Sequence, residues 1–252
     1  MMIAVKCFSI GLRLLVLAGF LGAGVISAPV AKADTTEAFH QALSDAYGHY
    51  REAFFYLRRG NAMTAAFELE SMAQKWQAIE ASFSTQPPPI YAGDAKWSTT
   101  LTEVGGMTRK ALTLASEGEA EPAYDLLKPL RSMLTELRSR NGVTLFRDHV
   151  EAANRAFRQL FHFRRNAPDF TDTKSVDSLR QRLTATIKAY KNTLDKAPPS
   201  VAGDEQFQRL INDSLYYLNR MWVAIDEKNQ LNVINILRRV VSSDEILWLR
   251  FG

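Results

Sequence analysis

Apolar residues recur every three or four positions along most of the chain beyond residue 34, a spacing typical of amphipathic helices. In the stretch 37–59 the apolar positions are Phe39, Leu43, Ala46, Tyr47, Tyr50, Phe54 and Leu57. On a helix of 3.6 residues per turn these positions form one stripe that a core can bury. The sequence has no alternating pattern of useful length that would indicate a strand. The pattern therefore predicts an all-α protein.

Glycine and proline mark the boundaries of eight predicted helices. Gly60 and Gly142 suit helix C-termini, prolines at 87–89 end the second helix, and Asp94 suits the N-cap of the third. Pro122 lies near the first position of the fourth helix, where a missing N–H is tolerated. The predicted ranges are about 37–59, 64–83, 94–117, 122–141, 144–165, 175–195, 204–227 and 231–250.

The second half of the chain repeats the first. The motif Pro-Pro-x-x-Ala-Gly-Asp occurs at 88–94 and again at 198–204, and without gaps 11 of the 55 positions in 88–142 are identical in 198–252. Four helices joined mostly by short loops pack best as an up-down-up-down bundle. We therefore expect two tandem four-helix bundles, residues 34–142 and 143–252, that arose by duplication.

Residues 1–33 have the features of a signal peptide. Lys6 and Arg13 precede an uninterrupted apolar run over 14–26, and the small-residue pattern at 31–33 suits cleavage after Ala33. The run is shorter than the roughly 20 residues of a transmembrane helix, although an uncleaved anchor is the alternative. Because Cys7 is the only cysteine, the cleaved chain would contain no disulfide. These features predict export to a bacterial periplasm.

The net charge of +4 does not indicate nucleic-acid binding. Lys6, Arg13 and Lys32 fall in the predicted signal peptide, which has no acidic residue, so the remainder carries 28 basic against 27 acidic residues. A nearly neutral chain lacks the basic surface that binding to phosphate backbones requires.

Two short phrases and the helix lengths resemble a known family. The phrases are Ala-Leu-Thr-Leu-Ala-Ser-Glu-Gly at 111–118 and Leu-Leu-Lys-Pro-Leu-Arg at 126–131. Together they resemble the periplasmic four-helix-bundle cytochromes, the cytochrome c-prime and small periplasmic cytochrome b type, over both halves of the chain. In the c-prime type the last helix carries Cys-x-x-Cys-His. The corresponding stretches, 132–136 and 242–246, contain neither cysteine nor histidine. The resemblance therefore implies a duplicated bundle without covalent haem.

The sequence offers little for metal binding or catalysis. Histidines nine or thirteen residues apart on one helix cannot converge on one ion. A single histidine with a methionine, such as His40 with Met107 or Met133, could bind haem b, but surface histidines and core methionines explain the same residues. Neither a nucleophile elbow nor a phosphate loop occurs, and Gly105 and Gly106 lie inside a helical pattern that predicts a close helix–helix approach. We expect no enzyme, no cofactor and no metal. The four histidines are His40, His49, His149 and His162.

In each bundle a pair of arginines lies at the end of the first helix, and a glutamate lies at the end of the third helix. We expect structural ion pairs that also complement the helix dipole, with an anion-binding notch as the alternative. The residues are Arg58, Arg59 and Glu117 in the first bundle, and Arg164, Arg165 and Glu227 in the second.

The C-terminal helix is apolar on every side at Ile246, Leu247, Trp248, Leu249 and Phe251. Such a helix must be covered, either by the other bundle or by a separate partner. Asp244 occupies the stripe position that Leu134 holds in the first repeat, so its carboxylate needs a partner unless the helix is rotated.

These features predict an exported, haem-free helical bundle that works by protein–protein binding, as a partner subunit, adaptor or scaffold for another periplasmic protein. One alternative is a carrier of non-covalent haem b or metal in electron transfer or metal handling. Another is a sensory or ligand-binding bundle that holds a small molecule between helices.

Overall fold

The computed structural model describes residues 30–252, with side chains from residue 35 onward, and its regular structure in that range is entirely helical. The prediction of an all-α protein is confirmed. The predicted signal peptide lies almost wholly outside the described residues and stays a prediction. No helix in the described range is long and apolar enough to cross a membrane.

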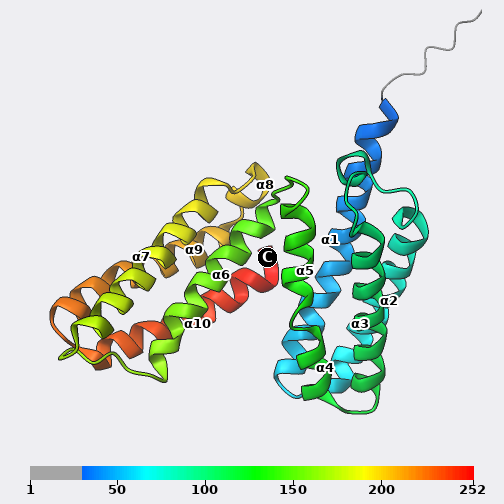
Figure 1. Ribbon diagram of the computed structural model, residues 1–252. Helices are drawn as coiled ribbons and strands as arrows, with labels where there is room; N and C mark the ends of the chain where they lie inside the picture. Colours follow the sequence, from blue (N-terminus) through cyan, green and yellow to red (C-terminus); the bar gives the residue numbers. More distant parts are fainter. Residues whose placement is uncertain (1–29) are drawn as a thin grey trace, which may run out of the picture.

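The chain folds into two four-helix bundles (Figure 1). The first comprises α1 (Val30–Arg58), α2 (Ala62–Phe83), the short η1 (Pro89–Tyr91), α3 (Trp97–Ser116), α4 (Ala120–Leu127) and α5 (Leu130–Ser139). The second comprises α6 (Phe146–Phe161), η2 (His162–Arg164), α7 (Thr173–Asp195), α8 (Pro199–Ala202), α9 (Glu205–Asp226) and α10 (Gln230–Phe251). In the first bundle α4 packs back on α1, and in the second α10 packs back on α6, as the up-down-up-down prediction requires.

Each bundle has its own apolar core. The core of the first bundle extends along the chain to Val143, and that of the second begins at Val150, so the chain passes between them near the predicted boundary. The exception is Trp248 of α10, which belongs to the core of the first bundle. The bundles are therefore joined by shared packing as well as by the connecting segment.

The fourth helix of the first bundle is interrupted, which corrects the prediction of one helix over 122–141. Pro129 stands between α4 and α5, because proline has no N–H to donate and its ring crowds the preceding turn. Arg239 holds the corresponding position in the second bundle, where α10 continues without a break.

The repeated proline motif forms a short helical turn in both halves, η1 after Pro88 and α8 after Pro198. Asp204 caps α9 by accepting from the Phe207 N–H at 2.9 Å. Asp94 instead accepts from the Lys96 N–H, and α3 begins only at Trp97, so the predicted Asp94 cap is wrong. The shared helix order agrees with duplication, which stays a prediction about ancestry.

Only one of the two adjacent glycines lies at a close helix–helix approach. A Cβ added at Gly105 would lie 2.9 Å from Trp76 Cδ1 and would also meet the Glu80 carboxylate, both on α2. A Cβ at Gly106 would meet nothing within 4 Å. The predicted close approach is therefore confirmed for Gly105 alone.

Candidate functional site

The C-terminal helix is covered mainly by its own chain. The Trp248 indole is only 5% exposed and meets the rings of Phe54 and Tyr50 edge-on, at centroid distances of 6.0 and 6.4 Å. The neighbouring Leu247 instead packs into the core of the second bundle. Leu249 and Phe251 are half-buried, and Ile246 remains 39% exposed. Of the two predicted coverings, the other bundle is the one that the structure shows for Trp248.

Asp244 has the partners that the sequence analysis required. Its carboxylate is buried, accepting from Tyr190 Oη at 2.6 Å and from Asn154 Nδ2 at 2.5 Å. Asn154 Oδ1 in turn accepts from Nη2 of Arg131, on α5, at 3.0 Å. Burial raises the pKa of Asp244 from 3.8 to about 6, against the opposing effect of Tyr190 and nearby arginines.

Two buried arginines of α5 hold the second bundle against the first. Arg131 Nε donates to Glu151 Oε2 at 2.9 Å, and Trp248 Nε1 donates to the same oxygen at 3.1 Å. The Arg131 guanidinium also lies 4.2 Å from the centroid of the Trp248 ring. Arg138 Nε donates to both carboxylate oxygens of Asp148 at 3.0 Å. These charge-assisted bonds fix the orientation of α6 relative to α5.

The arginines at the end of α1 form a different ion pair from the predicted one. Arg58 Nη1 lies 2.7 Å and Arg59 Nη2 lies 3.9 Å from the carboxylate of Glu245 on α10. Glu117 forms no ion pair with a described residue. The reason is that α10 packs beside the end of α1 and brings its own carboxylate there.

The corresponding pair in the second bundle is also not formed. The Arg164 guanidinium lies 5.6 Å from the Phe161 ring centroid, and within residues 35–252 neither Arg165 nor Glu227 takes part in an ion pair. At this end of the second bundle η2, which includes Arg164, packs against α10 of the same bundle.

Each histidine contacts one nearby polar residue. His40 Nε2 lies 2.9 Å from Tyr91 Oη, and His49 Nδ1 lies 2.8 Å from Glu68 Oε2. In the described range no group of three or more His, Cys, Asp or Glu residues is arranged to hold a metal ion. The other two contacts are His149 with Asn192 and His162 with Asn166.

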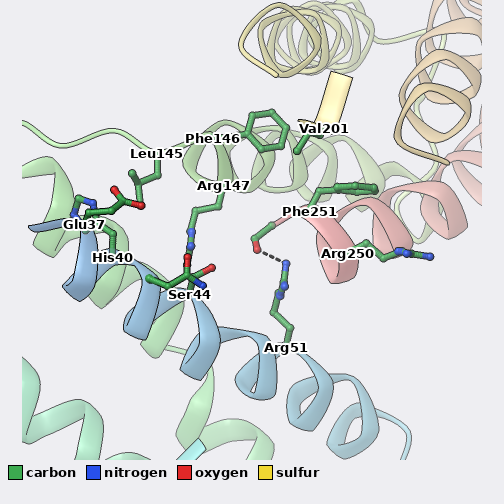
Figure 2. A pocket seen from close by; sticks show the side chains of 12 residues that line it. Glu37, His40, Ser44, Arg51, Leu145, Phe146, Arg147, Val201, Arg250 and Phe251 are labelled. Carbon is green, nitrogen blue, oxygen red and sulfur yellow. Dashed lines mark hydrogen bonds between the residues drawn. The ribbon is translucent and has the colours of Figure 1, made fainter. Parts of the chain in front are cut away.

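A cavity of about 330 Å³ opens where the two bundles meet, and we call it the inter-bundle cleft (Figure 2). It lies between the N-terminal half of α1, the start of α6, α8 and the end of α10. Its lining comprises Glu37, His40, Gln41, Ser44, Arg51, Leu145, Phe146, Arg147, Val201, Arg250, Phe251 and Gly252.

Two arginines enter the cleft from opposite bundles. Figure 2 shows Arg147 directed from α6 towards Ser44 on α1, while Arg51 rises from α1 and ends at a hydrogen bond drawn as a dashed line. Arg51 Nη1 donates to the main-chain oxygen of Gly252, but its buried Nε has no hydrogen-bond partner among the described residues. Arg147 has no hydrogen bond or ion pair with a described side chain. The guanidiniums of Arg51 and Arg147 lie 5.8 and 5.6 Å from the ring centroid of Tyr47.

Arg51 and Arg147 form no ion pair with a described acidic side chain. Burial lowers the pKa of Arg147 to about 10, and the neighbouring charges of Arg138 and Arg51 act in the same direction. Burial also lowers the pKa of Arg51. Glu37 is the only acidic side chain that lines the cleft, and it is exposed. The cleft also faces the first turn of α6, where the helix dipole adds partial positive charge.

Nothing in the sequence indicated Arg51 and Arg147 as site residues. Each lies on the polar flank of an amphipathic helix, where an arginine is expected to face solvent. Their 96-residue separation gives no local signal, since only the packing of one bundle on the other brings them together.

Comparisons of this chain with protein-family models, with curated proteins and with solved structures found no significant match. The resemblance to the four-helix-bundle cytochromes therefore stays a prediction.

Proposed function

We propose that this protein is an exported, non-enzymatic binding protein that holds a small anionic ligand in the inter-bundle cleft. The observation that supports the proposal is the pair of half-buried guanidiniums, Arg51 and Arg147, that share one cavity and form no ion pair with a described acidic side chain.

Partial burial of a cation without an acidic side chain as partner destabilises a fold, because the charge gives up part of its hydration. An oxyanion bound between Arg51 and Arg147 would supply the missing acceptors, since a guanidinium can donate two parallel hydrogen bonds to a carboxylate or phosphate. The cavity of about 330 Å³ lies within the range of small-molecule sites. Ligand binding therefore explains why the charges are kept.

The hypothesis that the C-terminal helix binds a separate protein no longer has its main supporting observation. That hypothesis rested on an apolar helix in need of a cover, and Trp248 and Leu247 are already covered by the two bundles. The cleft therefore replaces this helix as the site for which we propose a function.

The experiment measures oxyanion binding to the purified protein and to Arg147→Met by calorimetry and thermal unfolding, with inorganic phosphate and benzoate as probes. Chloride at equal ionic strength controls for screening. Arg155→Met removes a charge from an exposed, unpartnered position on the same helix and is the matched control.

We expect Arg147→Met to melt higher than the parent protein without ligand, because an unpaired, half-buried charge is gone. The same variant should lose roughly tenfold or more in oxyanion affinity, since hydrogen bonds to a charged group are removed. Arg155→Met should bind as the parent protein does. The proposal fails if neither probe binds, or if the two variants bind equally well.

A further inference from the structure

Part of the lining of the inter-bundle cleft is hydrocarbon. Phe146, at the start of α6, and Phe251, at the end of α10, both line the cleft and are half-buried. Between them lies the fully buried Phe207, whose ring centroid is 5.8 Å from that of Phe146 and 5.3 Å from that of Phe251, both edge-on. Edge-to-face packing holds the two outer rings in place.

Val201 of α8 completes this lining, and Figure 2 shows Phe146 and Phe251 near Val201. We call Phe146, Val201 and Phe251 the apolar wall. An inorganic ion bound to Arg51 and Arg147 would leave the apolar wall in contact with water.

We propose that the ligand is an organic oxyanion whose charged group lies between Arg51 and Arg147 and whose aromatic or alkyl group packs on the apolar wall. This inference rests on the proposed function and adds the chemical class of the ligand. The cavity has room for roughly ten water molecules at the volume each occupies in the liquid, which suits a single-ring acid better than a long acyl chain. The head group is a carboxylate or a phosphate, because arginine binds both in the same two-pronged geometry.

Four probes separate the contributions of head group and hydrocarbon: inorganic phosphate, phenyl phosphate, acetate and phenylacetate. Calorimetry at fixed ionic strength compares them on the full chain. Phenyl phosphate against phosphate, and phenylacetate against acetate, isolate the hydrocarbon, while the two phenyl compounds compare the head groups.

We expect each phenyl compound to bind roughly ten- to a hundredfold more tightly than its parent ion, from burial of one aromatic group. In Phe251→Ala the ratio of the phenyl compound's affinity to that of its parent ion should fall towards one, while the parent ions bind as before. Val201→Ser removes hydrocarbon from the same wall without disturbing the three-ring contact and should lower the ratio in the same way. Phe67→Ala, at a 64% exposed phenylalanine on α2, is the matched control and should leave all four affinities unchanged.

The inference is overturned if the phenyl compounds bind no better than phosphate and acetate, or if neither wall variant changes the ratio. In both cases the proposed function survives, provided that Arg147→Met still weakens binding. If none of the four probes binds, or if Arg147→Met binds them all normally, the proposed function fails and the inference with it.

Discussion

The carboxylate of Asp244 should make the stability of this protein fall as the pH rises through the mildly acidic range. Asp244 is buried beside Tyr190 and Asn154, and burial raises its pKa from 3.8 to about 6 in the folded state. Asp244→Asn keeps the shape of the side chain and removes its charge, so a comparison with this variant isolates the effect.

The sign follows from proton linkage. Because the folded state has the higher pKa, it binds this proton more tightly than the unfolded state. The resulting stabilisation is complete below pH 3.8 and is lost as the pH rises through about 6. The interval between the two pKa values corresponds to about 3 kcal/mol of unfolding free energy.

Urea denaturation followed by far-ultraviolet circular dichroism, from pH 4 to pH 8, measures this directly. The unfolding free energy of the parent protein minus that of Asp244→Asn should fall by about 2 to 3 kcal/mol over that range, because every other titrating group is common to both. Asp213→Asn, at an exposed carboxylate on α9 without a described partner, controls for loss of a surface charge. A difference that is flat, or that grows with pH, would refute the reasoning.

Three further measurements test the packing and the export prediction. Trp248→Ala should lower the unfolding free energy by about 3 to 5 kcal/mol, since it empties a site in the first core, whereas Ile246→Ala should lower it by less than about 1 kcal/mol. Gly105→Ala should destabilise by about 1 to 3 kcal/mol through overlap with α2, and Gly106→Ala should stabilise by about 0.5 to 1 kcal/mol; thermal unfolding separates them. Mass spectrometry of the exported protein should show cleavage after Ala33, and an intact N-terminus would contradict the signal-peptide prediction.

The periodic pattern of apolar residues was enough to predict the fold class and the order of the helices. Stripes such as the one through Phe39, Leu43 and Leu57 are local properties, and all three residues are buried as the pattern requires. The interruption at Pro129 was missed, because apolar positions stay in phase on both sides of it.

For the contacts between the bundles, the sequence indicated which residues need a partner but not which residues supply it. The sequence showed that Asp244 needed a partner and that Trp248 needed a cover, but Asn154 and the first core could not be named. The pairing of Arg58 with Glu245 was missed for the same reason: helical spacing orders residues within one bundle and says nothing about how a second bundle packs on it.

The break at Pro129 makes the tandem arrangement directional. It makes α5 a separate short helix, and Arg131 and Arg138 on α5 donate hydrogen bonds to carboxylates of the following bundle. The matching positions on the unbroken α10 are Val241 and Trp248, which offer no guanidinium to a successor. The first bundle thus binds the next bundle through arginine–carboxylate hydrogen bonds, whereas the matching positions of α10 could not bind a third bundle in this way.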